Sequence, residues 1–291
     1  MELVQKSKIL SYLFTPSFTK LLDQKSTNKI ISKVQNILNS SELEADINIK
    51  DKTILGLLTY CYEFIEKYYK CEYIYKNKIT NQILIQKHDI YNTALFSEFR
   101  VNKSKVDLFM INGYSCAYEI KTEIDSLERL DKQLDDYLKY FEYVNVVCGP
   151  DKVDKLLNEI PSQVGLILNN GQLLKEVKHP TYNLDNICLK ERYRSLRKSE
   201  IIEVISSFYG SCPNLSTYDI YSHCEPLFCD IPKDKAVKLS NQAMKKRIKR
   251  AEILKFIVDL PKAIQFLIFN CKLNLKSLDR IQSNLALPLQ I

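Results

Sequence analysis

A chain of 291 residues is long enough for about two domains and for an apolar core that needs neither disulfides nor metals. Its 45% hydrophobic and 26% charged residues are typical of globular proteins and exclude extended disorder. It has only 6 glycines, and neither GxGxxG nor GxxxxGK[ST] occurs, which excludes the glycine-loop nucleotide-binding motifs and leaves any ATPase activity to a partner.

The formal net charge of +7 is unevenly distributed. Residues 1–177 hold 23 basic and 24 acidic side chains, whereas residues 178–291 hold 19 basic and 11 acidic ones. The basic excess therefore lies entirely in the last part of the chain. Such asymmetry points to nucleic acid or another polyanion as a partner, and a solvated lysine-rich surface is the alternative.

The 9 cysteines do not form a disulfide or zinc pattern. Their number is odd, no CxxC occurs, and the nearest cluster (His223, Cys224 and Cys229) lacks a second pair of ligands. Buried thiols are expected instead. The first residues form no basic-then-apolar signal, and charges and a proline interrupt the apolar stretch 253–271. A cytoplasmic protein with no membrane partner is expected.

Hydrophobic spacing divides the chain into three regions. Apolar residues recur every three or four positions up to about residue 70, as in helices. The middle part mixes short strands with helices, and from about residue 178 three helices are expected, over 200–209, 216–228 and 233–258. The sequence thus predicts an N-terminal helical region (1–70), an α/β core (71–177) and a basic C-terminal helical region (178–291).

The middle region predicts a mixed β-sheet with helices on its faces. An amphipathic helix over 74–85 precedes strands expected over 97–101, 105–111, 115–121, 143–148 and 164–168. A helix with Asp125 or Ser126 as N-cap, and Glu128 placed for a capping box, follows the third strand. Pro150 opens another helix, and Asn170-Gly171 makes a tight turn after the fifth strand.

The first two turns determine which acidic side chains meet. A two-residue turn at Asn102-Lys103 places Glu98 opposite Asp107. A two-residue loop at Asn112-Gly113 would leave Asp107 opposite Tyr118. A three-residue loop, or a bulge near Tyr114, would bring it opposite Glu119, and we predict this register because Gly113 can adopt the left-handed conformation that such a loop needs.

Three carboxylates on one sheet face, with Lys121 beside Glu119 by strand alternation, repel one another and require compensation. A hard divalent cation, Mg²⁺ or Mn²⁺, would supply it and would stabilise charge on a phosphoryl group. A lysine beside the cation can orient the attacking water. The alternative is a solvated sheet face with an ion pair such as Glu98–Lys121.

The following helix carries Gln133-Leu134-Asp135-Asp136-Tyr137, in which Gln133 and Tyr137 share one helix face. The preceding strands contain Glu98-Phe99-Arg100-Val101, Lys105-Val106-Asp107-Leu108 and Tyr118-Glu119-Ile120-Lys121-Thr122-Glu123. From about residue 72 to 169 the chain resembles the PD-(D/E)XK nuclease superfamily, more narrowly its RecB-like members with a QxxxY motif and an uncharacterised bacterial family within it. The resemblance implies a restriction-endonuclease-like core, a mixed β-sheet with flanking helices.

The resemblance also implies roles for individual residues. Asp107 and Glu119 match the metal-binding carboxylates, the backbone carbonyl of Ile120 completes the coordination, and Lys121 matches the catalytic lysine. Gln133 and Tyr137 match the pair that helps to hold the DNA or the active site. A further acid is expected before or at the sheet, with Glu98 favoured on geometry and Glu63 or Glu72 as alternatives. Asp107 follows Val106 where the superfamily name has proline, which is a common departure.

A basic run in the last region is a second candidate feature. On the helix expected over 233–258, its five cations would cover more than one face and contact phosphates in a salt-sensitive way: Lys245, Lys246, Arg247, Lys249 and Arg250. A weaker cluster of the same kind is Arg192, Arg194, Arg197 and Lys198. The alternative for both is a solvated helix surface.

Together these features predict a Mg²⁺-dependent nuclease that hydrolyses phosphodiester bonds. DNA is favoured over RNA as the substrate, and phage defence or mobile-element conflict is the expected setting. A protein partner would supply any ATPase or targeting function. The competing hypothesis is a catalytically silent nuclease-like fold that serves as a nucleic-acid-binding or protein-assembly module.

Overall fold

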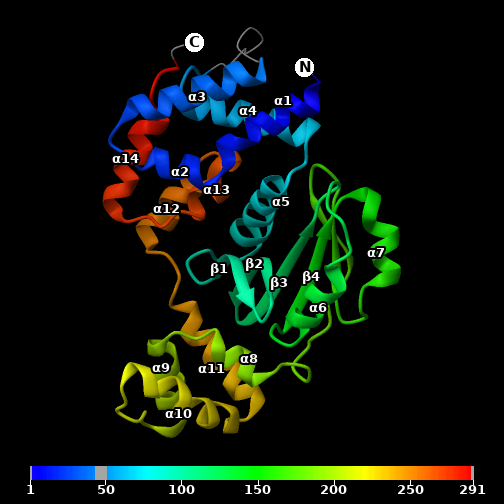
Figure 1. Ribbon diagram of the computed structural model, residues 1–291, viewed down its shortest axis with the longest axis vertical. Coiled ribbons are helices and arrows are strands. Elements are labelled where there is room, and N and C mark those ends of the chain that lie inside the picture. The colour runs from blue at the N-terminus through cyan, green and yellow to red at the C-terminus, as the bar shows by residue number, and fades with distance from the viewer. Residues whose placement is uncertain (1, 43–50, 290–291) are drawn as a thin grey trace. The chain divides into compact units, whose positions relative to one another are not determined.

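The computed structural model describes residues 2–42 and 51–289 (Figure 1). Contacts divide the chain into two compact units. The first comprises residues 1–87, 171–173 and 249–291, and the second comprises residues 88–170 and 174–248. Within the described ranges, no helix is both long enough and apolar enough to span a membrane.

The first unit is helical. Its α-helices are α1 (Leu3–Leu10), α2 (Pro16–Leu22), α3 (Thr27–Ser41), α4 (Ile54–Tyr68), α5 (Glu72–Lys78), α12 (Ala251–Asp259), α13 (Gln265–Phe269) and α14 (Leu275–Leu285). A π-helix, Ile79–Ile85, continues α5, and the 3₁₀ turns Ser11–Phe14 and Lys262–Ile264 complete the unit. Local sequence sets several helix starts: Pro16 stands at the first position of α2, and the Thr53 side chain accepts a hydrogen bond from the Gly56 N–H at the start of α4.

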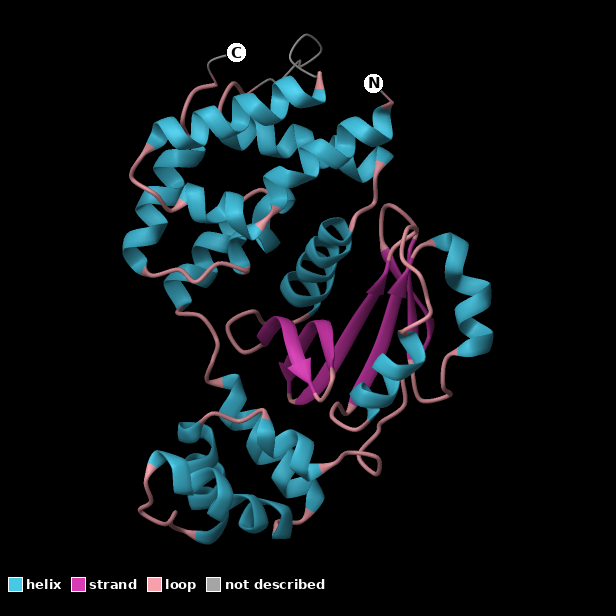
Figure 2. Cartoon of the chain, in the orientation of Figure 1, coloured by secondary structure: helices cyan, strands magenta, loops and turns pink. Residues whose placement is uncertain are grey.

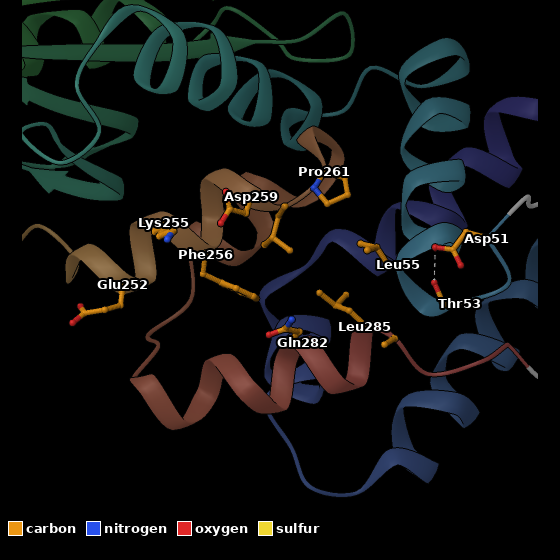
Figure 3. Close-up of a pocket in the computed structure, with 12 residues that line it drawn as sticks. Asp51, Thr53, Leu55, Glu252, Lys255, Phe256, Asp259, Pro261, Gln282 and Leu285 are labelled. Carbon is orange, nitrogen blue, oxygen red and sulfur yellow. Dashed lines mark hydrogen bonds between the residues drawn. The ribbon is translucent and has the colours of Figure 1, made fainter.

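A cavity of about 600 Å³ opens among α4, α12 and α14 of this unit (Figure 3). Its apolar part includes Leu55, Phe256 and Leu285, whose side chains point toward one another across it. Its rim carries charged groups, including Asp51 and Glu252. None of the residues predicted to bind a metal or nucleic acid lines this cavity.

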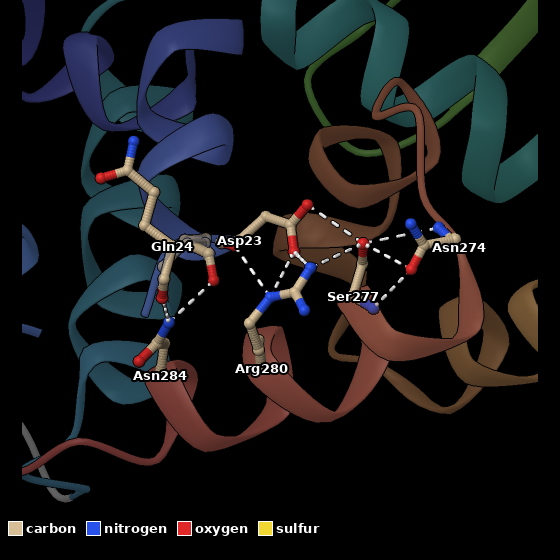
Figure 4. Close-up of polar contacts among 7 residues, drawn as sticks. Asp23, Gln24, Asn274, Ser277, Arg280 and Asn284 are labelled. Atoms are coloured by element: carbon tan, nitrogen blue, oxygen red, sulfur yellow. Dashed lines mark hydrogen bonds and ion pairs between the residues drawn. The ribbon is translucent and has the colours of Figure 1, made fainter. Parts of the chain in front are cut away.

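The C-terminal helix α14 belongs to the same unit as the N-terminal helices because polar contacts join them (Figure 4). The Arg280 guanidinium donates to the Asp23 carboxylate through Nε (3.0 Å) and Nη2 (2.6 Å). The Asn284 side chain donates to the backbone carbonyls of Leu22 and Gln24, both at 2.9 Å. The expected ranges 1–70, 71–177 and 178–291 therefore do not coincide with the two units, since the last range is divided between them.

The second unit is built on a six-stranded sheet in the order β1-β2-β3-β4-β5-β6, drawn in magenta in Figure 2. Its strands are β1 (Ala94–Val101), β2 (Ser104–Asn112), β3 (Tyr114–Lys121), β4 (Tyr143–Cys148), β5 (Gly165–Asn169) and β6 (Leu174–Lys178). The first three strands are antiparallel, β3, β4 and β5 are parallel, and β6 pairs antiparallel with β5. The prediction of a mixed α/β fold with helical flanks is confirmed, and so are its five strands; β6, whose residues are mostly exposed, was not predicted.

The helices of the second unit are α6 (Leu130–Leu138), α7 (Val153–Glu159), α8 (Leu189–Arg194), α9 (Lys198–Tyr209), α10 (Thr217–Asp230) and α11 (Lys233–Lys245). The predicted start of α6 is wrong: the helix begins at Leu130 after Arg129. Asp125 instead closes a turn, because its carboxylate accepts hydrogen bonds from the backbone N–H (2.8 Å) and the hydroxyl (2.7 Å) of Thr122. The single helix expected over 233–258 is also wrong, since α11 ends at Lys245 and α12 begins at Ala251.

Candidate active site at the β1–β2–β3 hairpins

The first hairpin places Glu98 opposite Asp107, as predicted. The pairs on either side of this position are Ser97 with Leu108 and Phe99 with Val106. Their spacing is that of a two-residue turn at Asn102-Lys103. Two carboxylates on adjacent strands are thus brought together by the turn that the sequence encodes.

The second hairpin has the register that we predicted, with Asp107 opposite Glu119. Asn112 pairs with Tyr114 across Gly113, which has a φ of +80°. The ladder continues to the pair Leu108–Tyr118, and the next position brings Asp107 opposite Glu119. The left-handed conformation of one glycine therefore fixes the register of the candidate site.

The regular alternation of the strands breaks at this site. On β1, the rings of both Phe96 and Phe99 pack against Phe109, although strict alternation would put them on opposite faces. Glu98 lies between them with a φ of +54°. On β2, Val106 and Phe109 likewise belong to one buried core. Both strands thus change the face of their side chains at the same place, beside Glu98 and Asp107.

The distortion lets a side chain take the place of a backbone acceptor. Asp107 Oδ2 accepts a hydrogen bond from the backbone N–H of Ile120 at 2.7 Å. This contact lies just beyond the last paired position between β2 and β3. Asp107 is thereby fixed against β3, one residue away from both Glu119 and Lys121.

A second group of polar side chains is centred on Glu119. Lys121 Nζ donates to Glu119 Oε1 at 2.9 Å and to Gln133 Oε1 at 2.8 Å. The Tyr137 hydroxyl donates to Glu119 Oε2 at 2.8 Å, and the backbone carbonyl of Lys105 lies 3.0 Å from it as a second acceptor. The structure therefore brings together four of the predicted residues: Glu119, Lys121, Gln133 and Tyr137.

Burial sets the electrostatics of this group. Glu119 is 2% exposed and Lys121 is 8% exposed. Desolvation raises the pKa of Glu119, and the Lys121 ammonium only partly offsets that effect. Burial, together with the Glu119 carboxylate, raises the pKa of Tyr137 far above its ordinary range, so this phenol remains a neutral donor. The geometry holds a carboxylate and an ammonium in fixed positions out of bulk water.

Glu98 and Asp107, the other two predicted acids, are more exposed to solvent than Glu119 is. Glu98 and Asp107 each have a carboxylate oxygen within 4.8 Å of the other's. Glu98 also forms an ion pair with Lys105 at 2.5 Å, which replaces the Glu98–Lys121 pair considered as the alternative arrangement. Lys105 was not singled out in the sequence, although the hairpin register would have identified it: it lies two residues before Asp107 on the strand facing Glu98.

Carboxylate oxygens at this spacing are the donors that hard divalent cations prefer. Glu98 and Asp107 could share one cation. Glu119 is not part of this close carboxylate group, and its two oxygens accept hydrogen bonds from Lys121 and Tyr137, so its role as a metal ligand stays a prediction. The expected contribution of the Ile120 carbonyl stays a prediction. The alternative acids lie in the first unit: Glu63 on α4, and Glu72 at the start of α5, where it forms an ion pair with Lys76.

The basic run is not displayed on one helix. Lys245 is the last residue of α11 and Arg250 is the N-cap of α12. Between them, Lys246 and Arg247 form a turn, and Ile248 and Lys249 have no regular secondary structure. This segment also contains the boundary between the two units, after Ile248. The helical part of that interpretation is therefore wrong, whereas nucleic-acid contact stays a prediction for the five cations.

Intramolecular partners engage three cations of the run. Arg247 forms a bidentate ion pair with the buried Glu200. Lys246 pairs with Glu203 at 2.7 Å. Lys249 Nζ donates to the backbone carbonyl of Cys271 at 2.7 Å. Phosphate contact by these side chains would compete with the existing partners.

The weaker basic cluster contains both buried and exposed side chains. Arg192 is completely buried and donates to the backbone carbonyl of Tyr140 at 2.9 Å, so its place in a surface cluster is wrong. Arg194 and Arg197 are exposed. Hydrophobic periodicity could not distinguish the buried arginine from the exposed ones, because α8 has only six residues and Arg197 lies after its end.

Comparison with known proteins places the chain in a family. Residues 65–281, more than half of the chain, match the family model of bacteriophage P4 protein cII. Protein cII of Enterobacteria phage P4 is 40% identical over 63 residues, which are 22% of this chain. The matched stretch spans only 24% of the length of that relative.

Among solved structures, the SPO1766 protein of unknown function from Silicibacter pomeroyi is similar at a TM-score of 0.29, with 14% identity. That match covers 43% of this chain and 87% of the other. The family match includes all of α6 and the strands β1, β2 and β3, and hence the whole candidate site. The chain belongs to the family of bacteriophage P4 protein cII.

Proposed function

We propose that this protein is a metal-dependent nuclease of the PD-(D/E)XK type that hydrolyses phosphodiester bonds in DNA. The observation that carries the proposal is the buried contact of Lys121 with both Glu119 and Gln133, next to the carboxylates of Asp107 and Glu98. A buried ammonium and a buried carboxylate are expensive to keep in a fold, and such groups concentrate at functional sites. The alternation break at Glu98 is a strained feature of the same kind.

The donor set fits a hard divalent cation such as Mg²⁺ or Mn²⁺. Glu98 and Asp107 would hold it through carboxylate oxygens that lie within 4.8 Å of each other, and the strand register makes Glu119 the expected third ligand. When bound, the cation would stabilise charge on the phosphoryl group and lower the pKa of a coordinated water.

The chain's own residues supply positioning. Two of the three N–H donors of Lys121 are used by Glu119 and Gln133, which leaves the third for an attacking water or a phosphate oxygen. Tyr137 holds the second oxygen of Glu119 and stays neutral because its pKa is raised. Gln133 lies between the two, since its Nε2 is 3.5 Å from the Tyr137 hydroxyl. Gln133 and Tyr137 thus act through Lys121 and Glu119.

The test is a cleavage assay with single- and double-stranded DNA and RNA, in Mg²⁺ or Mn²⁺ and in EDTA. Wild type is expected to cut DNA only with metal. Lys121→Ala should lower the rate by a factor of about 10² or more, the range for losing a positioned catalytic group. Lys155→Ala, which removes an exposed lysine on α7, is the matched control and should cut as wild type does.

Two results would contradict the proposal. Cleavage that persists both in EDTA and in Lys121→Ala would exclude this mechanism. Failure of wild type to cut any of the substrates would favour a binding or assembly role instead. Preferential cleavage of RNA would keep the mechanism and correct the substrate.

The biological setting is part of the proposal. A DNA nuclease in a family defined by a phage protein would act in the cytoplasm, in phage defence or in conflict between mobile elements. A protein partner would supply ATP-driven unwinding or targeting.

A further inference from the structure

A cavity of about 440 Å³ lies in the second unit, at the tip of the β1–β2 hairpin and against α8. Six residues from these elements line it: Phe99, Arg100, Asn102, Glu191, Arg194 and Ser195. None of them is among the residues that the sequence predicts to bind metal or to catalyse.

The cavity is cationic. It contains two guanidinium groups, those of Arg100 and Arg194, against the single carboxylate of Glu191. Arg100 is exposed, and Arg194 pairs with Glu191 at 2.7 Å while its side chain remains 60% exposed. The Glu191 side chain is only 18% exposed, so Arg194 is expected to keep this partner and to offer its remaining N–H donors, on the exposed side, to a second anion.

The other lining residues, Asn102, Ser195 and Phe99, are held in place by contacts within the protein. Asn102 Nδ2 donates to Asp136 Oδ1 at 2.7 Å. Ser195 Oγ donates to the backbone carbonyl of Arg192 at 2.7 Å. The ring of Phe99 packs on Phe109 with centroids 5.1 Å apart. The two exposed guanidinium groups therefore lie beside side chains that are fixed by internal contacts, and they are the cationic groups available to a ligand.

The cavity adjoins the candidate active site along the strands. Arg100 lies two residues after Glu98 on β1, or about 6.6 Å along a strand. Arg100 pairs with Lys105, whose backbone carbonyl is 3.0 Å from the Tyr137 hydroxyl. A nucleic-acid strand carries a charge about every 3.4 Å of its axis, so a strand cut at the carboxylates would present further phosphates at this distance.

We infer that Arg100 and Arg194 form a phosphate-binding subsite that holds the DNA backbone next to the scissile bond. The inference rests on the proposed function for the direction of the strand, and it extends that function by naming the residues that bind the substrate. Arginine suits this role because its planar fork can bind two phosphate oxygens at once. Such contacts position the strand without reading its sequence.

The experiment measures DNA binding in a Lys121→Ala background, in EDTA, so that cleavage does not interfere. The probe is a fluorescein-labelled 20-nucleotide single strand, or its duplex, followed by anisotropy across a salt titration. In that background Arg100→Gln/Arg194→Gln should raise Kd by about 10-fold or more at low salt. The slope of log Kd against log salt should fall by about 1.4 for the single strand and about 1.8 for the duplex, as for two lost phosphate contacts.

The matched control is Lys155→Gln/Lys175→Gln, which removes two cations from exposed positions on α7 and β6. An equal loss of binding in this control would mean that net charge alone is responsible, and would overturn the inference. Arg100→Lys/Arg194→Lys keeps the charge but not the fork, and should restore only part of the affinity. Equal thermal unfolding of all variants excludes misfolding as the cause.

The outcome also separates this inference from the proposed function. If wild type cuts DNA and the arginine variant binds and cuts normally, the subsite is excluded while the nuclease stands. If wild type cuts nothing but the arginine variant alone loses DNA binding, the phosphate contact is supported and the nuclease is excluded. In an active background, the arginine variant should raise KM with little change in kcat.

Discussion

The side chain of Asp107 occupies the place of a backbone acceptor, taking the N–H of Ile120 at 2.7 Å where β2 and β3 part. This one contact gives Asp107 a structural and a chemical role. Its Oδ2 ties two strands together, while its carboxylate lies within 4.8 Å of the carboxylate of Glu98. A substitution can separate the two roles, because binding a metal needs the negative charge whereas accepting the Ile120 N–H does not.

We expect Asp107→Asn to keep the fold and to lose cleavage. The Asn carbonyl can accept the Ile120 N–H, but it lacks the negative charge that a metal requires. Asp107→Ala should lose cleavage as well, and should lower the free energy of unfolding by about 1–3 kcal/mol because the buried N–H loses its acceptor. Urea unfolding measured beside the cleavage assay distinguishes the two variants. Equal stability of Asn and Ala variants would contradict the structural role.

A second prediction concerns the glycine that sets the register of this hairpin. Gly113 has a φ of +80°, and a Cβ there would meet no atom within 4 Å. Gly113→Ala should therefore cost only the backbone penalty for a left-handed residue, about 1–2 kcal/mol. Gly113→Asn should cost less, since Asn tolerates that conformation. Chemical denaturation of both variants tests this order, and a larger loss for Asn than for Ala would contradict it.

The hairpins could be predicted because their determinants are local. The turns at Asn102-Lys103 and Asn112-Gly113, together with strand periodicity, were sufficient to place Glu98, Asp107 and Glu119 opposite one another. The spacing of Gln133 and Tyr137 likewise places both side chains beside Glu119 and Lys121. The site was thus largely encoded in short-range patterns.

What could not be predicted depends on contacts between distant segments. The break in alternation at Glu98 appears only once the rings of Phe96 and Phe99 are packed on Phe109. The residues between α11 and α12 include no glycine or proline, so the sequence gives no sign that the helix ends there. The boundary between the two units lies in this segment. Arg192 looked like a surface cation because its partners, Tyr140 and Ser240, lie about 50 residues away on either side.

Arg192 is expected to be essential for the fold of the second unit. It is fully buried, and it donates to the Tyr140 carbonyl at 2.9 Å, to Ser240 Oγ at 2.6 Å and to Asn241 Oδ1. Asn241 in turn donates to the buried carboxylate of Glu142 at 2.7 Å. Arg192→Met should lower the free energy of unfolding by about 3–5 kcal/mol, because removing one member of a buried charged network leaves the others uncompensated.

Arg192→Lys should not restore this stability, since a lysine cannot reproduce the fork that reaches three acceptors. Lys190→Met, which removes an exposed lysine on the same helix, is the control and should change stability by no more than about 0.5 kcal/mol. The measurement is urea-induced unfolding followed by circular dichroism. A lysine variant as stable as wild type would show that charge, and not geometry, is what the site requires.

In the first unit, the contact between Arg280 and Asp23 is expected to couple the C-terminal helix to α2. Both side chains are 30% exposed, and the guanidinium reaches the carboxylate through two nitrogens (Figure 4). A double-mutant cycle with Arg280→Ala and Asp23→Ala should give a coupling energy of about 1–2 kcal/mol, above that of an exposed pair. Lys29→Ala, on the exposed side of α3, should show no coupling to Asp23→Ala.

The last prediction is a pH dependence that arises from Lys249. This lysine donates to the Cys271 carbonyl at 2.7 Å and lies over the Phe269 ring, and burial lowers its pKa below the ordinary 10.5. Between the lowered pKa and 10.5 the unfolded chain binds more protons than the folded protein does, so stability rises with pH in that interval. Below it both states are charged, and the cost of burying the ammonium is constant.

Lys249→Met keeps the length and the ring contact of the side chain but removes the titration. The free energy of unfolding of wild type minus that of Lys249→Met should therefore rise as pH increases from 7 toward 10. Subtracting the variant cancels the many tyrosines and lysines that titrate in the same range. A flat difference for Lys249→Met would contradict the lowered pKa of Lys249 in the folded protein.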